Sequence, residues 1–472
     1  MVKFCKNFTI LFFILEKKEN MRFHTINPVD NNILNTYSFI EDKDIMDKLF
    51  IAQKAYEKWK NFSYSSRIGY IMKLSSSMQD LIEIIAYLIT QEMGKPITQS
   101  RLEVEKCIKL CEYYSNLEES IFFQDISTEY EKSYIRFEPI GSILGIMPWN
   151  YPIWQTLRYA IPNILLGNVI VLKPATNTAG CSLLLEKIFI ESGFPRGIFQ
   201  VFLIDIPKIK SVIAHPIIQG VSFTGSHLAG SHIGYLSGKY IKKSVLELGG
   251  NDAFVVMRDV ENLKKTAKLA TESRLNNTGQ TCISAKRFIV DNFIVDDFID
   301  LVIQEMKQYQ RGDVHDKYTK IGYISRVDLS EKLDKQYKDI ISNGGKVCLQ
   351  TTRDENFFSP CLLKMEDNNF SSNQEEIFGP IGIVYTFSNE EEIPSMVNAT
   401  CYGLGASIWT KDLKKAEFLS KKINTGMVFV NEIVKSDPRF PFGGIKKSGY
   451  GRELSVLSLK EFSNCKTIII NK

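Results

Sequence analysis

The 472-residue sequence has few of the residues that hold metal ions in proteins. It contains five dispersed histidines, and none of its nine cysteines belongs to a CxxC pair, although Cys107 and Cys111 share one face of an expected helix. The spacing typical of a zinc site is therefore absent, and we expect no bound metal. Scattered cysteines of this kind fit a reducing, cytoplasmic compartment best.

Clustered positive charge is lacking as well. The net charge is +4, and the charged residues, 24% of the chain, are spread thinly without a basic stripe or a polybasic tail. Proteins that bind the phosphates of nucleic acids usually carry such a patch. We therefore expect no nucleic-acid partner.

Long apolar runs are missing too. The N-terminal segment, residues 1–20, has lysines before an eight-residue apolar run, which superficially resembles a secretory signal. The run is far shorter than the roughly 20 residues that span a bilayer, and no small-residue cleavage site follows it. We therefore expect neither export nor membrane insertion. Because Met21 begins the next segment, we expect residues 1–20 to be a disordered tail or an extension upstream of the true start.

The apolar residues that are present, 44% of the chain, predict a globular protein whose length suggests two or three domains. From residue 43 to 117 they recur at helical spacing, which predicts an opening set of helices. Later, short apolar runs bounded by Gly and Pro alternate with helical stretches, which predicts an α/β fold with parallel sheets. There is no internal repeat and no low-complexity linker, so we expect the domains to be interleaved in sequence and tightly packed.

Cys282 stands in the stretch NNTGQTCISAKRF, among small polar residues. A buried structural cysteine usually has apolar neighbours, whereas a reactive one needs access and groups that stabilise its thiolate. The context favours a reactive cysteine, but an ordinary structural cysteine is the more frequent alternative when a cysteine is considered alone.

Other positions suggest chemistry at the ends of strands. Lys173 ends an apolar strand, and open α/β sheets bind ligands at the carboxyl ends of their strands; a solvated turn lysine is the alternative. The Gly225-Ser226 turn precedes a helix whose free N–H groups suit a phosphate, or it serves packing alone. Glu247 ends another apolar strand, where desolvation would raise its pKa and make it a usable general base; a salt-bridged glutamate is the alternative. Asn150 lies in a turn where its amide could donate to an oxyanion, although asparagine is common in turns.

The order of the motifs separates these alternatives. The chain contains, in sequence, PWNYP, VLKPAT, FTGS, LELGG, NTGQTC, EEIFGP, YGLGASIWT and PFGGIKKSGYGREL. In this order and spacing it resembles the NAD(P)-dependent aldehyde dehydrogenases from about Ile26 onward. The resemblance implies a Rossmann-type coenzyme domain (21–127 and 141–248), an α/β catalytic domain (249–454) and a small β oligomerisation element (128–140 and 455–472). It also implies a homodimer or homotetramer, in which the C-terminal strand pairs with a neighbouring subunit.

The resemblance assigns catalytic roles to three residues. Cys282 corresponds to the nucleophile, whose attack on the aldehyde gives a tetrahedral thiohemiacetal. Asn150 and the backbone N–H of Cys282 would stabilise the oxyanion. After hydride transfer to the nicotinamide, Glu247 would activate the water that hydrolyses the thioester to a carboxylic acid.

The implied coenzyme is NAD or NADP. The positions that the resemblance assigns to coenzyme binding are Trp149, Lys173, Thr176, Gly225, Ser226, Leu248, Glu376 and Phe378. Among these, Glu376 and Phe378 match positions that hold the nicotinamide ribose and ring. Relatives often have glutamate where Thr176 stands, so the choice between NAD and NADP stays open. Many relatives have lysine where Asn251 stands, a departure that weakens no catalytic assignment.

Within the family the chain is most similar to succinate-semialdehyde dehydrogenases. These enzymes carry an arginine eight residues after the asparagine, here Arg158, and a serine five residues before the proline of PFGG, here Ser436. The likeness implies a short aldehyde that ends in a carboxylate. A second arginine of some such enzymes is replaced by Asn276, with Arg274 nearby. The alternatives are another small aliphatic aldehyde and an Arg158 that lies at the surface or in a subunit interface.

Two other function classes stay open on the residues alone. A cysteine hydrolase would use Cys282 without a coenzyme, but none of the five histidines lies in a comparable glycine-rich segment. A non-catalytic protein could keep the fold alone, although the joint presence of Cys282, Glu247 and Asn150 argues against it.

Overall fold

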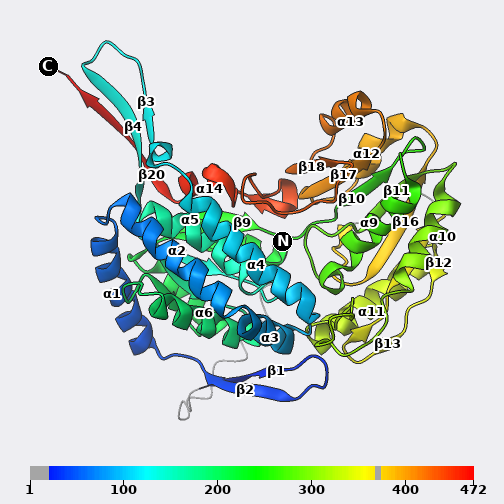
Figure 1. Ribbon diagram of the computed structural model, residues 1–472, viewed down its shortest axis with the longest axis horizontal. Coiled ribbons are helices and arrows are strands. Elements are labelled where there is room, and N and C mark those ends of the chain that lie inside the picture. Colours follow the sequence, from blue (N-terminus) through cyan, green and yellow to red (C-terminus); the bar gives the residue numbers. More distant parts are fainter. Residues whose placement is uncertain (1–20, 367–373, 472) are drawn as a thin grey trace, which may run out of the picture.

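The computed structural model describes residues 21–366 and 374–471. The segment 1–20, on which the prediction of a tail falls, lies outside the described residues, as do residues 367–373 and Lys472. Two lobes, each built on a large sheet, lie side by side, and a three-stranded arm projects from one of them (Figure 1). The predicted α/β class is confirmed.

A six-stranded sheet forms the centre of the first lobe, with the strand order β19-β9-β8-β5-β6-β7. All neighbouring strands are parallel except the short β19, which is antiparallel to β9. The chain leaves β5 toward β6 on one side and returns to β8 on the other, so the order of the strands reverses beside β5. Open α/β sheets bind ligands at such a switch point. The bounds are β5 (Ser142–Ile146), β6 (Val169–Lys173), β7 (Phe199–Val201), β8 (Ile218–Thr224), β9 (Lys243–Glu247) and β19 (Gly449–Tyr450).

Helices cover both faces of this sheet, which explains why its strands read as short, continuous apolar runs. The helical spacing over 43–117 correctly predicted the first four helices. The helices of the lobe are α1 (Asp42–Trp59), α2 (Tyr64–Asp80), α3 (Ile82–Met93), α4 (Ile97–Ser115), α5 (Trp154–Leu166), α6 (Ala179–Glu191), α7 (Ile206–Ala214), α8 (His227–Lys239) and α14 (Ser455–Glu461).

A seven-stranded sheet forms the second lobe, in the order β12-β15-β16-β11-β10-β17-β18, with only β12 antiparallel to its neighbour. The strands are β10 (Ala253–Val256), β11 (Arg287–Asp291), β12 (Gly345–Leu349), β15 (Cys361–Met365), β16 (Ile381–Phe387), β17 (Gly405–Trp409) and β18 (Met427–Val430). The helices are α9 (Leu263–Leu275), α10 (Val295–Met306), α11 (Val327–Ser342), α12 (Ile393–Asn398) and α13 (Leu413–Ser420).

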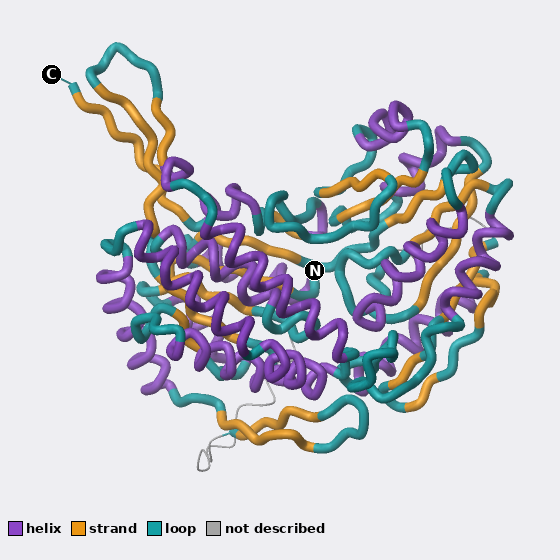
Figure 2. Tube along the Cα trace, viewed as in Figure 1, coloured by secondary structure: helices purple, strands orange, loops and turns teal. Residues whose placement is uncertain are grey.

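Three smaller sheets complete the fold. The projecting arm joins β3 (Phe123–Asp125), β4 (Lys132–Pro139) and β20 (Ser463–Ile470) in antiparallel order, as the strand traces in Figure 2 show. The hairpin of β1 (Arg22–Ile26) and β2 (Ile33–Ser38) and the pair β13 (Arg353–Asp354) and β14 (Phe357–Phe358) are additions that the apolar spacing did not predict. Among the described helices, none is both long and apolar enough to cross a membrane.

Candidate active site

The loop that carries Cys282 begins with an unusual backbone turn. After α9, a 3₁₀ turn spans Asn276–Gly279, and Asn277, Thr278 and Gly279 have φ values of 53°, 56° and 74°. Residues other than glycine rarely adopt this left-handed backbone conformation, and at Gly279 a Cβ atom would lie 2.4 Å from the carbonyl oxygen of Gly379. The glycine of NTGQTC is therefore required by close packing, and the reversal that it permits directs Cys282 toward open space.

Two fully buried cations fix this loop. Arg274 donates through Nη2 to the carbonyl oxygens of Gly279 (2.8 Å) and Gly379 (2.6 Å). Lys286 donates through Nζ to the carbonyl oxygens of Thr281 (3.0 Å) and Cys282 (2.5 Å). Because the carbonyl oxygens are held by charge-assisted hydrogen bonds, the loop is rigid on both sides of the cysteine.

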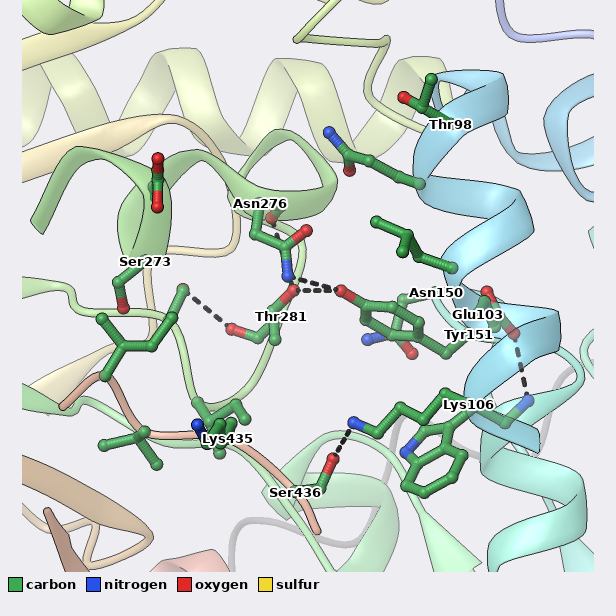
Figure 3. Close-up of a pocket in the computed structure, with 18 of the residues that line it drawn as sticks. Thr98, Glu103, Lys106, Asn150, Tyr151, Ser273, Asn276, Thr281, Lys435 and Ser436 are labelled. Carbon is green, nitrogen blue, oxygen red and sulfur yellow. Dashed lines mark hydrogen bonds between the residues drawn. The ribbon is translucent and has the colours of Figure 1, made fainter. Parts of the chain in front are cut away.

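Cys282 opens onto a cavity of about 770 Å³, called here the Cys282 cavity. Its wall is formed by α4, the start of α5, the Cys282 loop and the segment 433–436, and it brings four predicted residues together: Asn150, Arg158, Cys282 and Ser436. Figure 3 shows Asn150 and Tyr151 beside α4 and Ser436 across from Lys106. Asn276 also lines the cavity, whereas Arg274 does not.

The side chain and the backbone of Asn150, the predicted oxyanion donor, are both held by hydrogen bonds. Its Nδ2 donates to the carbonyl oxygen of Gln280 (3.0 Å), and its backbone carbonyl oxygen accepts from Asn277 Nδ2 (2.8 Å). One N–H of the amide is left for a ligand, and the backbone N–H of Cys282 has no acceptor within the described chain. These two donors are the pair that the sequence predicted.

The predicted phosphate-binding positions lie at the carboxyl ends of β6 and β8, the two strands that flank β5. Lys173 ends β6, and its Nζ atom makes no hydrogen bond or ion pair with a described residue, while burial lowers the pKa of its ammonium group and Asp205 raises it. Ser226 caps α8 after β8, and its Oγ accepts from the backbone N–H of Ala229 (3.3 Å). Thr176 is exposed at the next turn after Lys173. An available ammonium group, a helix N-terminus and an exposed hydroxyl fit a dinucleotide coenzyme.

Glu376 and Phe378, which are predicted to hold the nicotinamide ribose and ring, contact Gly250 and Trp149, which follow β9 and β5 of the first lobe. Trp149 and Phe378 pack edge to face, with ring centroids 5.8 Å apart. Glu376 Oε1 accepts from the backbone N–H of Gly250 (3.1 Å) and lies 3.5 Å from Lys286 Nζ, so it is coupled to the Cys282 loop. Leu248 is buried, and its side chain occupies the space that a Cβ at Gly230 would need.

The sequence profile of the aldehyde dehydrogenase family matches residues 14–468. The chain belongs to the aldehyde dehydrogenase family. It is 36% identical to the succinate-semialdehyde dehydrogenase (NADP+) of Deinococcus radiodurans over 94% of both chains, and 36% identical to a probable enzyme of that name from Synechocystis over 95% of this chain and 100% of the other. The solved succinic semialdehyde dehydrogenase from Streptococcus pyogenes, in complex with NADP+, superposes with a TM-score of 0.92 at 32% identity, covering 95% of this chain and 100% of that one.

These comparisons confirm the predicted family and fold, and with them the prediction of an NAD(P)-dependent oxidoreductase that acts on aldehydes. The cysteine hydrolase and the non-catalytic protein are therefore set aside. Roles of individual residues in this aldehyde dehydrogenase rest on the geometry of the site.

Burial dominates the chemistry of Cys282 in this aldehyde dehydrogenase. It raises the pKa of the thiol to about 12, although the positive charges of Arg158 and Lys286 lower it. The polar neighbours in the sequence suggested a stabilised thiolate, but desolvation outweighs them in the structure. The thiol is therefore protonated at neutral pH in the free site.

Glu247 is equally removed from water. It ends β9 with 2% exposure, and neither carboxyl oxygen has a hydrogen-bond partner among the described residues. Burial raises the pKa of Glu247 well above its ordinary value, and the neighbouring Glu453 raises it further, while Arg158 lowers it. Glu247 does not line the Cys282 cavity itself; its Oε1 lies against Gly443, where a Cβ would come within 2.5 Å.

Arg158 is not a surface arginine, so that alternative is wrong. It has 2% exposure and forms an ion pair with Glu453, while its guanidinium lies 4.5 Å from the centre of the Phe442 ring. Its Nη2 atom is buried without a partner among the described residues. Glu453 belongs to the motif PFGGIKKSGYGREL, so the sequence could have drawn attention to a charge at this position. Its pairing with Arg158 could not be predicted from the sequence.

Sequence reasoning missed Lys106, which also lines the Cys282 cavity. Lys106 lies on α4, outside every motif, and it reaches the cavity because α4 packs against α5. No signal in the sequence distinguishes it from Lys109, the exposed lysine of the same helix.

Replacement of Glu247 tests its role in hydrolysis of the thioester. Glu247→Gln keeps the shape of the side chain but cannot take a proton from water, so turnover should stop after hydride transfer. We expect a burst of reduced coenzyme in stopped-flow absorbance, followed by a steady-state rate about 10²–10⁴-fold below that of the unmodified enzyme. A complete loss of the burst would show that Glu247 acts earlier.

The raised pKa of Cys282 predicts a steep pH dependence of its reactivity. Below the pKa, the thiolate fraction grows tenfold per pH unit, so alkylation of Cys282 by iodoacetamide should accelerate about 100-fold between pH 7 and pH 9. The measurement follows the modified Cys282 peptide by mass spectrometry, because other cysteines are also exposed. A plateau below pH 9 would indicate a thiolate that the site stabilises after all.

Proposed function

We propose that this aldehyde dehydrogenase oxidises succinate semialdehyde to succinate and prefers NADP to NAD. The observation that carries the substrate is the basic end of the Cys282 cavity, where Arg158, Lys106 and Ser436 line the same wall. A carboxylate at the far end of a short aldehyde complements these groups. The names of the relatives from Deinococcus radiodurans and Streptococcus pyogenes support the same substrate.

The reaction uses groups that the site holds in fixed positions. The thiol of Cys282 first gives its proton to solvent water, and the resulting thiolate attacks the carbonyl carbon. Asn150 Nδ2 and the backbone N–H of Cys282 bind the oxyanion that forms, and each donor contributes about 3 kcal/mol. When bound, the oxidised nicotinamide supplies the hydride acceptor. Glu247 in its ionised form then takes a proton from the water that hydrolyses the thioester, and Cys282 leaves as the restored thiol.

The preference for NADP rests on Thr176 and Lys173. Thr176 is exposed and neutral, so it does not repel a phosphate on the ribose. The ammonium group of Lys173, at the end of β6 just before the turn that carries Thr176, can pair with that phosphate. Two relatives carry NADP+ in their names, and the Streptococcus pyogenes structure holds it as the cofactor.

We also propose that the enzyme is a cytoplasmic homodimer or homotetramer whose subunits meet through the arm. In the arm, β20 pairs with β4 along one edge only, and its end exposes Ile469 and Ile470. An unpaired strand edge with exposed apolar side chains favours pairing with another chain.

A substrate panel tests the proposed function. With NADP, we expect kcat/KM for succinate semialdehyde to exceed that for butanal, which has the same chain length without the carboxylate, by about tenfold or more. The rate is followed by the absorbance of the reduced coenzyme, and Cys282→Ser should abolish the signal. Equal values for the two aldehydes would refute the substrate while leaving the enzyme class intact.

A charge at position 176 tests the choice of coenzyme. In Thr176→Glu, the added carboxylate should repel the 2′-phosphate, so kcat/KM with NADP should fall by about tenfold or more. The value with NAD should change little, because NAD carries no phosphate there. The matched control is Thr176→Gln, which has the same length without the charge, and an equal loss with both coenzymes would mean that residue 176 does not face the ribose.

A further inference from the structure

Lys106 differs from Arg158, the other cation at the basic end of the Cys282 cavity, because Arg158 is paired with Glu453 whereas Lys106 forms no ion pair with a described carboxylate. It projects from α4 toward the segment 433–436, donates from Nζ to Ser436 Oγ, and lies 4.2 Å from the centre of the Trp154 ring (Figure 3). The side chain is half-buried, and its stem packs along the wall. Its ammonium group is therefore aimed at a fixed place inside the cavity.

The charges around Lys106 are already balanced without it. Arg158 is paired with Glu453, and both are buried. Glu103, one turn before Lys106 on α4, is paired with Lys95 at 2.6 Å, and this pair is also buried.

No described carboxylate forms an ion pair with Lys106 itself. Burial and, to a smaller extent, the positive charge of Arg158 lower the pKa of Lys106 to about 8, so the group stays mostly protonated at pH 7. The inner wall thus carries one positive charge in excess, which fits one anionic group of a ligand.

Ser436 adds a second donor at the same place. Because Ser436 Oγ accepts the hydrogen bond from Lys106, the hydroxyl proton of Ser436 is left to donate elsewhere. Two donors side by side, one of them charged, match the two oxygens of a carboxylate. The Trp154 ring covers one side of the Lys106 ammonium group.

We propose that Lys106, with Ser436, binds the carboxylate of the acid-aldehyde substrate and sets the preference for it. The inference rests on the function proposed above and deepens it. In this arrangement Arg158 contributes mainly as half of a neutral pair with Glu453, so the charge that selects the substrate is that of Lys106.

The test replaces Lys106 with methionine, which keeps the length of the side chain and removes its charge. Lys106→Met should lower kcat/KM for succinate semialdehyde by at least about 30-fold and change the value for butanal by less than about threefold. Lys106→Arg, which keeps the charge, should restore most of the loss. The matched control is Lys435→Met, since Lys435 lines the same cavity but is paired with Glu432 at 2.8 Å, and it should leave the ratio of the two substrates unchanged.

A second measurement is independent of turnover. In the Cys282→Ser background, the binding of succinate in calorimetry should weaken at least about 30-fold on Lys106→Met, while thermal unfolding reports whether the variant is folded. An unchanged preference in Lys106→Met, or an equal loss with both aldehydes in a folded variant, would overturn the role of Lys106 and leave the proposed substrate standing. A native enzyme that does not prefer succinate semialdehyde to butanal would refute the substrate, and the role of Lys106 with it.

Discussion

The catalytic centre depends on buried cations that hold backbone carbonyl groups. Arg274 donates hydrogen bonds both to the turn before Cys282 and to the loop at Gly379. Lys286 donates to the carbonyl oxygens of Thr281 and Cys282 and forms an ion pair with Glu376. A cation removed from water is costly unless its donors are used, so each side chain stays where its acceptors are. The same contacts join the Cys282 loop to the residues of the predicted nicotinamide site. Fixed hydrogen bonds therefore set the distance between the predicted nucleophile and that site.

Burial has a second effect, which is chemical. The thiol of Cys282 and the carboxyl of Glu247 are both removed from water, which raises the pKa of each above that of the same group in solution. Each therefore keeps its proton to a higher pH than a free side chain would. A site of this kind is unreactive until a proton is removed, which limits side reactions of the free enzyme. Removal of the proton from the Cys282 thiol is therefore helped by nearby positive charge. Arg158 and Lys286 are the cations that lower the pKa of Cys282.

The motifs predicted the residues proposed to act on the common parts of the reaction, because these residues lie at strand ends and glycine turns whose backbone geometry is local. Gly279 illustrates this, since its left-handed φ and its contact with Gly379 leave space for no side chain. The partners of charged groups could not be predicted in the same way. Arg158 meets Glu453 across 295 positions and Lys106 meets Ser436 across 330, so these contacts depend on how α4 and α5 pack rather than on any local pattern.

Selection of the substrate has to come from such long-range charge contacts. A volume of about 770 Å³ is in the range of cavities that hold drug-sized ligands, so a four-carbon aldehyde fills only a small part of it. Apolar fit discriminates weakly even in a close-fitting site, where one methylene group changes binding by about 1–3 kcal/mol. A neutral Arg158–Glu453 pair adds little net attraction for an anion. The two ion pairs next to Lys106, Arg158–Glu453 and Lys95–Glu103, are balanced. The uncompensated ammonium group of Lys106 beside a hydroxyl is therefore the feature that can fix the far end of a short acid-aldehyde, and with it the distance from the aldehyde carbon to Cys282.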